Sequence, residues 1–202
     1  MGQVFGIFPQ PIWHAKIEKE FSEEEKNFIE KQECISNKFN TVSLNKKILD
    51  AEIMKTLRQE FHKEISQYIK NVMAPKNYIE VYITQSWINY SKAGNSHFLH
   101  AHPNSLLSGV YYVNAVKEKD AIIFEKEYST IRVDTENFNP FNSTNWTIKV
   151  ETGTLLIFPS SLLHRVECLD DDYEGTRTSI SFNTFIRGNF GNDMGAYGLE
   201  LL

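Results

Sequence analysis

Three histidines, His97, His100 and His102, lie close together in the sequence, and His164 follows after a long intervening stretch. His100 and His102 are two residues apart, and side chains of an extended strand repeat every two residues. An H-x-H pair on a strand therefore points both imidazoles to one side, and a histidine from a later strand could complete three ligands around one metal ion. His97 is out of phase with the pair, so we do not expect it to be a ligand.

The spacing of these histidines leaves both the metal and its role open. Imidazole is a good ligand for iron, zinc, copper and nickel. Three protein ligands leave coordination positions free for substrate and for water or a gas, which is typical of catalytic sites. Packed or surface histidines explain the spacing alone about as well as a metal site does. For the remaining two, His14 and His62, we expect structural or solvent-facing roles.

A second group of polar residues follows His164. Arg177 and Ser179 alternate with Thr178, so both can point to the same side of one strand. A guanidinium group beside a hydroxyl group is suited to a carboxylate, which arginine can bind in bidentate fashion. The alternative interpretation is a surface arginine paired with an aspartate of the acidic turn at residues 170–172.

The chain around these residues has a predominantly β pattern from Tyr78 onward. Apolar and β-branched runs there alternate with turn residues. We expect eight strands, at Ile79–Tyr90, Leu99–His102, Leu106–Val113, Ala121–Phe124, Thr147–Val150, Thr154–Phe158, Leu163–Cys168 and Thr178–Phe185. Residues 125–146 form a long polar loop, and loops of this length are often functional or disordered. The glycine-rich segment 188–195 is expected to be irregular.

The first 77 residues are expected to support this β region. Residues 3–17 predict a strand or hairpin. Ser22, followed by three glutamates, predicts the start of a short helix that reaches about Gln32. A longer helix is predicted from Asp50 to about Met73, because apolar residues recur there at every fourth position. These apolar residues are Ile53, Leu57, Phe61, Ile65 and Ile69.

Helices followed by about eight strands favour an α+β, mainly β protein. We expect a double-stranded β-helix (jelly roll) whose N-terminal helices pack on one sheet. One domain over residues 1–202 is predicted, with a strand and supporting helices in 1–77, the β-helix core in 78–186 and a C-terminal tail in 187–202.

Composition narrows the class of protein. The chain has 202 residues, of which 41% are hydrophobic and 23% charged, as in ordinary globular domains. A net charge of −5 argues against binding nucleic acid or an anionic membrane through bulk charge. Cys34 and Cys168 are far apart and form no C-x-x-C motif, so we expect a reducing, cytoplasmic location.

Together these blocks resemble iron(II)- and 2-oxoglutarate-dependent dioxygenases, and particularly a poorly characterised branch of that superfamily. The similarity covers roughly residues 80–186. It rests on H-x-H-P-x-S-x-x-S-G-V-Y-Y-V at His100–Val113, G-x-L-x-x-F-P-S-x-L-x-H at Gly153–His164 and R-x-S-x-S-F-N at Arg177–Asn183. The resemblance also implies a double-stranded β-helix fold.

The resemblance implies that His100 and His164 bind Fe(II). Most of the superfamily has Asp or Glu at the position of His102, and the exchange would remove one negative charge from the ligand set. We expect His102 to bind the metal, with a water molecule in its place as the alternative.

The same resemblance assigns the cosubstrate site. It implies that Arg177 and Ser179 hold the distal carboxylate of 2-oxoglutarate. Tyr90 and Tyr112 match positions that often hydrogen-bond the cosubstrate, although either could instead be a core residue that bonds to the backbone. Asn183 is expected to lie behind the residues that touch the metal and the cosubstrate.

The implied activity is oxidative decarboxylation of 2-oxoglutarate to succinate and CO2, coupled to oxidation of a substrate, most commonly hydroxylation. The substrate could be a small molecule or a peptide. The 125–146 loop and the glycine-rich tail are expected to act as lids, and a homodimer would agree with the habits of the superfamily. The rival interpretations are a cupin-like three-histidine enzyme that does not use 2-oxoglutarate, and a non-catalytic β-sandwich binding module.

Overall fold

The computed structural model describes residues 2–36, 39–126, 134–191 and 198–202. In chain order its elements are β1 (Trp13–Lys16), α1 (Glu23–Glu30), β2 (Cys34–Ser36), β3 (Thr41–Ser43), 3-10 turns at Ile48–Asp50 and Glu52–Met54, α2 (Lys55–Tyr68), a π-helical turn at Ile69–Met73, β4 (Ile79–Ser91), β5 (His97–His100), β6 (Leu107–Asn114), β7 (Ala121–Glu125), β8 (Asn145–Lys149), β9 (Thr154–Pro159), β10 (Leu163–Val166), β11 (Arg177–Phe190) and β12 (Leu199–Leu201).

Strands β4 to β11 are divided between two sheets, and successive strands change sheet except that β7 and β8 both lie in the smaller one. Among the described residues, the larger sheet has the order β1-β9-β6-β11-β4-β3-β2, with β12 paired to β11, and the smaller sheet has the order β5-β10-β7-β8. Neighbouring strands run antiparallel. This arrangement is the double-stranded β-helix that the sequence predicts. All eight predicted strands form, and their ends shift by a few residues.

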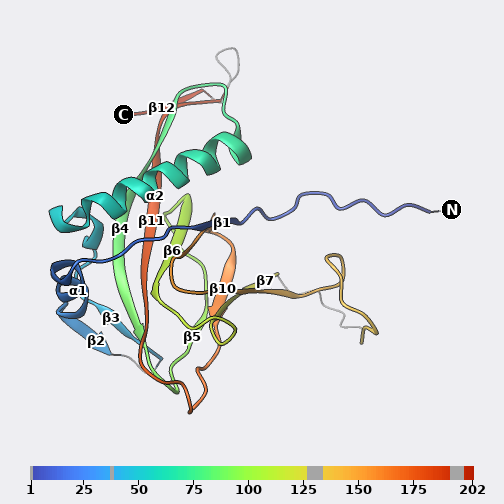
Figure 1. The fold of residues 1–202 in the computed structure, drawn as a ribbon. Helices are drawn as coiled ribbons and strands as arrows, with labels where there is room; N and C mark the ends of the chain where they lie inside the picture. The colour runs from blue at the N-terminus through green and yellow to red at the C-terminus, as the bar shows by residue number, and fades with distance from the viewer. Residues whose placement is uncertain (1, 37–38, 127–133, 192–197) are drawn as a thin grey trace.

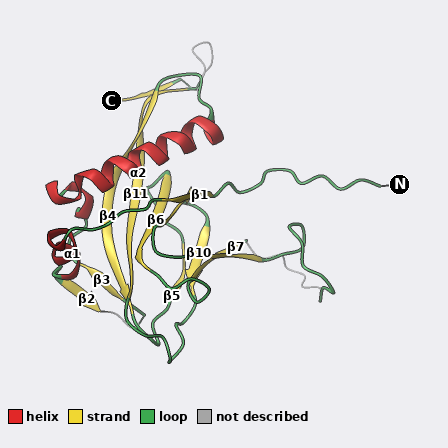
Figure 2. Ribbon diagram, in the orientation of Figure 1, coloured by secondary structure: helices red, strands yellow, loops and turns green. Residues whose placement is uncertain are grey.

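The helices cover the outer face of the larger sheet (Figures 1 and 2). Helix α1 begins with a capping box, in which Ser22 and Glu25 bond reciprocally to each other's backbone N–H. Helix α2 buries Leu57, Phe61 and Ile65, three members of the predicted apolar stripe. The ring of Phe61 stacks on Phe182 of β11 with 5.2 Å between ring centroids, which holds the helix against the sheet.

Two hydrophobic clusters lie on opposite faces of the larger sheet, because alternate side chains of each strand point to opposite sides. On β6, Tyr111 belongs to the cluster beneath the helices. Its neighbours Val110 and Tyr112 belong to the cluster between the two sheets. Successive side chains of β6 therefore point alternately into the core beneath the helices and into the space between the two sheets.

Gly109 allows the closest contact in this core. A Cβ atom at this position would lie 2.1 Å from Cζ of Phe182, well inside van der Waals contact. The absence of a side chain lets the Phe182 ring pack directly on the β6 backbone. The same position lines the cavity between the sheets.

The segments at the two ends of the chain differ from the predictions. Of the predicted strand or hairpin at residues 3–17, only β1 forms, by pairing with β9. The preceding residues extend away from the body with Val4, Phe5, Ile7 and Phe8 exposed (Figure 1). Pro9 and Pro11 cannot donate backbone hydrogen bonds to a ladder.

At the other end, Gly188–Phe190 were predicted to be irregular but continue β11 and pair with β12. The hydrogen bonds to this partner strand hold the glycine-containing stretch in an extended conformation. The remaining predicted residues 192–197 lie outside the described residues. No helix in the described part of the chain is long and apolar enough to cross a membrane.

Candidate metal and cosubstrate site

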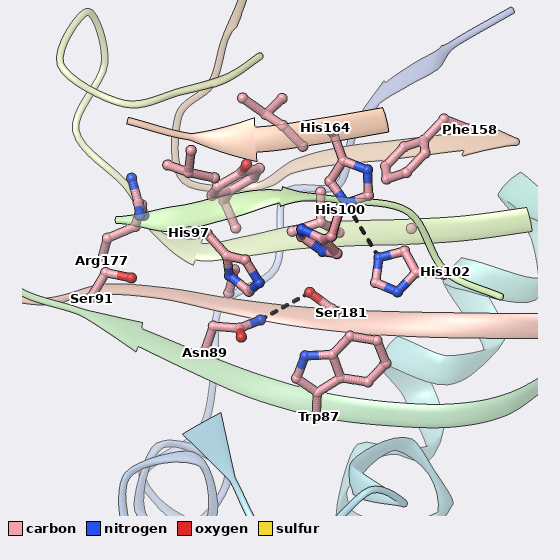
Figure 3. A pocket seen from close by; sticks show the side chains of 16 residues that line it. Trp87, Asn89, Ser91, His97, His100, His102, Phe158, His164, Arg177 and Ser181 are labelled. Carbon is pink, nitrogen blue, oxygen red and sulfur yellow. Dashed lines mark hydrogen bonds between the residues drawn. The ribbon is translucent and has the colours of Figure 1, made fainter. Parts of the chain in front are cut away.

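Neighbouring strands of the smaller sheet carry two of the predicted metal ligands. His100 ends β5 and His164 lies on β10, and the two are direct partners across the ladder. His102 lies just beyond the end of β5, where its backbone N–H donates to the carbonyl oxygen of Ser160 at 2.8 Å. The strand is therefore as long as predicted but begins and ends two residues earlier, and all three rings meet at one place (Figure 3).

The three imidazoles form a compact group. One ring nitrogen from each of His100, His102 and His164 lies within 4.8 Å of the others. The Nε2 atoms of His102 and His164 are 3.2 Å apart. Metal–imidazole bonds are about 2.1 Å long, so small ring rotations would bring all three nitrogens onto one ion.

Backbone carbonyls fix the orientation of two of the rings. Nδ1 of His100 lies 2.7 Å from the carbonyl oxygen of Phe98, and Nδ1 of His164 lies 2.9 Å from that of Leu162. A carbonyl oxygen can only accept, so each Nδ1 carries the proton and each neutral ring has a lone pair on Nε2. This tautomer and this kind of backing hydrogen bond are typical of metal-binding histidines.

Burial keeps these rings neutral. Desolvation lowers the pKa of His102 to about 3, with repulsion from His164 and His100 adding to it, and lowers the pKa of His164 to about 4. Desolvation also lowers the pKa of His100. At neutral pH all three imidazoles are therefore in the form that binds cations.

His97 lines the same pocket but stands outside this group. Its ring stacks on His100 with 4.4 Å between centroids. Its Nδ1 lies 3.3 Å from the amide nitrogen of Asn40, which is a donor, so Nδ1 accepts. His97 thus supports the ring of a predicted ligand from the side.

The other end of the pocket is lined by polar side chains from the larger sheet. Arg177 on β11 is the direct partner of Ser91 on β4, and Ser179 is the direct partner of Tyr112 on β6. All four are buried and line the pocket that the histidines share. The strand register therefore brings one guanidinium and three hydroxyl groups onto one wall.

The three hydroxyl groups on this wall are available to a ligand. Within the described part of the chain, the hydroxyls of Ser91, Ser179 and Tyr112 form no hydrogen bond, and none of them is sealed off from the pocket. Burial raises the pKa of Tyr112 to about 12, so this phenol stays protonated and can donate. Ser91 was not predicted as a site residue, because a single serine at the end of a strand forms no recognisable sequence pattern.

Arg177 is held by an acidic residue that the sequence did not single out. Its Nη1 lies 3.1 Å from Oδ1 of Asp120, which is fully buried just before β7. The alternative that Arg177 is a surface residue paired with the 170–172 turn is therefore wrong. In the sequence, Asp120 looks like an ordinary residue of a charged turn.

Comparison with known proteins identifies the family. Residues 85–183, from β4 to β11, match the model of a family described as "Putative 2OG-Fe(II) oxygenase". The matched stretch contains His100, His102, His164, Arg177 and Ser179. The match covers residues 85–183, just under half of the chain, and indicates a 2OG-Fe(II) oxygenase. The chain is therefore an oxidoreductase by family. No curated protein sequence gives a significant match to it.

Solved structures of similar fold include members of the same family. SnoN, a non-heme alpha ketoglutarate dependent epimerase from nogalamycin biosynthesis, gives a TM-score of 0.63 at 11% identity and covers 95% of this chain and 89% of its own. HygX from Streptomyces hygroscopicus, with nickel and 2-oxoglutarate bound, gives a TM-score of 0.61 at 10% identity and covers 95% of this chain and 92% of its own. An oxidoreductase of the 2OG-Fe(II) oxygenase family from Burkholderia pseudomallei gives a TM-score of 0.58 at 11% identity and covers 86% of this chain and 83% of its own. At such identities these likenesses establish the shared fold.

One predicted cosubstrate residue of this oxygenase lies elsewhere. On β4, Asn89 and Ser91 face the pocket, so Tyr90 between them faces the opposite side. There its hydroxyl donates to the carbonyl oxygen of Ile29 at the end of α1. The prediction that Tyr90 contacts the cosubstrate is wrong, because strand alternation turns its side chain towards the helices.

Asn183 lies behind the histidines of the oxygenase, as expected. Its Oδ1 accepts from the hydroxyl of Ser108 at 2.8 Å, and Ser108 is 2.8 Å from the hydroxyl of Ser160. The carbonyl of Ser160 in turn accepts the backbone N–H of His102. This chain of hydrogen bonds connects β11 to the backbone that carries His102.

The described residues of the two predicted lids do not line the pocket. Residues 134–144 of the long loop extend away from the body of the oxygenase (Figure 1). Residues 127–133 and 192–197 of the two segments lie outside the described residues.

Proposed function

We propose that this oxygenase binds Fe(II) through His100, His102 and His164 and binds 2-oxoglutarate as its cosubstrate, with Arg177 holding the distal carboxylate. One observation carries the proposal: neutral imidazoles gather at one end of a buried pocket whose other wall presents a guanidinium and hydroxyl donors. Related support comes from HygX, which shares the fold and has nickel and 2-oxoglutarate bound.

The donor set fits both groups. Imidazole nitrogens suit iron, and three protein ligands leave open positions for a chelating 2-oxo acid and a gas. Arg177 offers only donors to an incoming carboxylate, and the hydroxyls of Ser179, Tyr112 and Ser91 can each donate to it as well. When bound, Fe(II) and 2-oxoglutarate would supply the O2-dependent oxidation of a substrate, with succinate and CO2 as co-products.

The chain's own residues orient and shield this chemistry. The Nε2 lone pairs of His100 and His164 are held towards the metal position by their Nδ1–carbonyl bonds. Phe158 packs against His164 with 4.8 Å between ring centroids and, with Ile122, lines the pocket with apolar surface that excludes water. The polar wall then fixes the far end of the cosubstrate, which sets its direction relative to the histidines.

We further propose that the oxidised substrate is a small molecule or a peptide that approaches beside His102. A second hollow of about 570 Å³ shares this histidine with the buried pocket. Its other lining residues carry no charge; they are Tyr82, Thr84, Gln85, Pro103, Asn104, Asn183 and Phe185. The hollow is therefore suited to an uncharged, hydrogen-bonding part of a substrate, for which hydroxylation is the expected outcome.

Thermal melting with stepwise addition of ligands tests the proposal, because a ligand that binds only the folded state raises Tm. Under argon, Fe(II) should raise the Tm of the wild type, and 2-oxoglutarate should raise it further. His164→Ala should abolish both shifts. The double variant Tyr112→Phe/Ser179→Ala keeps the Arg177–Asp120 pair and should reduce only the second shift.

Other outcomes would point to the rival functions. A shift with Fe(II) but none with 2-oxoglutarate would favour a three-histidine enzyme of a different kind. No shift with any divalent metal would leave a binding module with packed histidines. Equal 2-oxoglutarate shifts in the wild type and the double variant would contradict the assignment of the polar wall.

A further inference from the structure

Arg177 belongs to a buried network whose other members touch neither the histidines nor the open part of the pocket. Asp120 is fully buried and accepts three hydrogen bonds. Oδ1 accepts from Nη1 of Arg177 at 3.1 Å, and Oδ2 accepts from the hydroxyl of Tyr173 at 2.8 Å and from the backbone N–H of Val116 at 2.6 Å. Both carboxylate oxygens are thus engaged.

The network joins three separate parts of the fold. Arg177 is the first residue of β11 in the larger sheet, and Asp120 immediately precedes β7 in the smaller sheet. Tyr173 lies in the turn between β10 and β11, where its backbone N–H closes on the carbonyl of Asp170. The network therefore ties the two sheets together at the end of the pocket opposite the histidines.

A contact of this kind fixes the direction of the guanidinium. Arginine has five N–H donors in a rigid planar fork, so holding one nitrogen also sets the plane of the others. The long side chain would otherwise have several rotamers, and ordering it at the moment of binding would cost conformational entropy. Asp120 removes that cost in advance and leaves further donors for a ligand.

We propose that Asp120 and Tyr173 are positioning residues that hold Arg177 ready for the distal carboxylate of the cosubstrate. The inference rests on the proposed function. Asp120 orients the guanidinium directly, and Tyr173, with the Val116 N–H, orients Asp120. The pair also balances the charge of Arg177 before the ligand arrives, so recognition depends on the direction of donors rather than on net positive charge.

The competing explanation is that the network only stabilises the fold. Two 2-oxo acids separate the explanations, because 2-oxoglutarate has a distal carboxylate and 2-oxobutyrate does not. Both share the 2-oxo acid group. A merely structural defect would weaken both, whereas a misdirected Arg177 would weaken only the ligand whose distal carboxylate it meets.

The experiment is anaerobic calorimetric titration of the Fe(II)-loaded full chain with each 2-oxo acid. Asp120→Asn replaces one acceptor oxygen by an amide donor, which then faces donors of Arg177, Tyr173 or Val116. We expect Asp120→Asn to weaken 2-oxoglutarate binding about tenfold or more, as outer contacts of a binding site typically do. Binding of 2-oxobutyrate should change less than about twofold.

Two further variants complete the design. Tyr173→Phe leaves the Arg177–Asp120 pair in place and should weaken 2-oxoglutarate in the same direction by a smaller factor, so the test stands even if Asp120→Asn fails to fold. Asp172→Asn is the matched control, because this exposed carboxylate of the same loop pairs with Lys119 at 3.6 Å and with no other described residue. It should leave both affinities unchanged.

The outcomes separate the two levels of the argument. Unchanged 2-oxoglutarate affinity in both Asp120→Asn and Tyr173→Phe would overturn the positioning role, as would equal losses for the two acids. Failure of the wild type to bind any 2-oxo acid would instead overturn the proposed function, and this inference with it.

Discussion

At the scale of single residues, His102 would decide the charge of the proposed metal site. Its ring nitrogen lies 3.2 Å from that of His164, whose Nε2 carries a lone pair because its Nδ1 donates to Leu162. In the absence of a metal, His102 Nε2–H can therefore donate to His164. For Nε2 to bind a metal, the proton of the neutral ring would have to lie on Nδ1 instead. Three neutral imidazoles give the ion less compensating charge than two imidazoles and a carboxylate would.

Ligation by His102 predicts a clear effect of its removal. His102→Ala should weaken Fe(II) binding by about tenfold or more, and His102→Asp should restore much of it, since a carboxylate is also a good iron ligand. His14→Ala, which changes an exposed histidine of β1, is the matched control. Fe(II) affinity can be measured by competition with a chelator under argon. Equal affinities in wild type and His102→Ala would show that water, not His102, completes the site.

The lowered histidine pKa values predict a dependence of stability on pH. The ordinary pKa of 6.5 falls to about 4 for His97 and His164 and to about 3 for His102, chiefly through burial. The unfolded chain therefore takes up protons between pH 6.5 and about 4 while the folded chain does not, so stability is full above pH 6.5 and falls on acidification.

Urea unfolding of the metal-free protein at pH 7.5 and pH 5.0 checks this dependence. The midpoint should be lower at pH 5.0, and His102→Ala should show a smaller difference. The shifted carboxyl groups, such as Glu25, begin from a pKa of 4.5 in the unfolded chain, so most of them are still ionised at pH 5.0 and the histidines account for most of the change. The same midpoint at both pH values would contradict the buried, neutral state of the histidines.

The two tyrosines predicted to bind the cosubstrate should now behave differently. Tyr112→Phe removes a donor from the pocket and should weaken 2-oxoglutarate binding severalfold. Tyr90→Phe removes the hydrogen bond to Ile29 and should lower the free energy of unfolding by about 1 kcal/mol while leaving 2-oxoglutarate binding unchanged. Parallel titrations and urea melts of both variants make the comparison. A loss of binding in Tyr90→Phe would contradict the strand orientation.

Sequence reasoning found the histidines and Arg177 because their spacing and neighbouring residues form patterns. It missed Asp120, since the contact with Arg177 spans 57 residues and no local pattern marks it. It assigned Tyr90 to the wrong face of β4, because the face on which a strand tyrosine lies is known only once the direction of an adjacent side chain is known. Ser91 emerged only from the register between β4 and β11.

At the scale of elements, the periodic segments were predictable and the ends were not. The strands from β4 to β11 followed from their apolar runs, and α2 followed from its apolar stripe. Pairing decided the rest: Gly188–Phe190 became strand because β12 pairs with them, while residues 3–12 have no ladder partner among the described residues. The partner of a strand lies outside the segment itself, so the local pattern of residues does not reveal it.

Gly109 gives a prediction at this scale. Gly109→Ala would place a methyl group against the Phe182 ring, which α2 holds in place through Phe61, so the strand or the ring must move. Overpacking of this kind costs about 1–3 kcal/mol of unfolding free energy. Gly2→Ala, with no atom near its added Cβ, is the control. An unchanged urea midpoint for Gly109→Ala would show that the contact is looser than the structure indicates.

At the scale of the whole molecule, the site exists because two sheets face each other. The smaller sheet and the segment that follows β5 carry the histidines, whereas the larger sheet carries Arg177, Ser179, Ser91 and Tyr112. A ligand that contacts both ends must lie between the sheets. The division of strands β4 to β11 between the sheets therefore places the polar wall opposite the three histidines.

The most direct test of this account is anaerobic titration of the metal-free protein with Fe(II) and then 2-oxoglutarate, followed by visible spectroscopy. The wild type should develop a weak metal-to-ligand charge-transfer band on adding 2-oxoglutarate. Tyr112→Phe/Ser179→Ala should need a higher concentration to reach the same band. Arg177→Ala is less suitable as the first variant, because it would leave the buried carboxylate of Asp120 without its charge partner. Fe(II) binding without such a band at any concentration of 2-oxoglutarate would contradict the account.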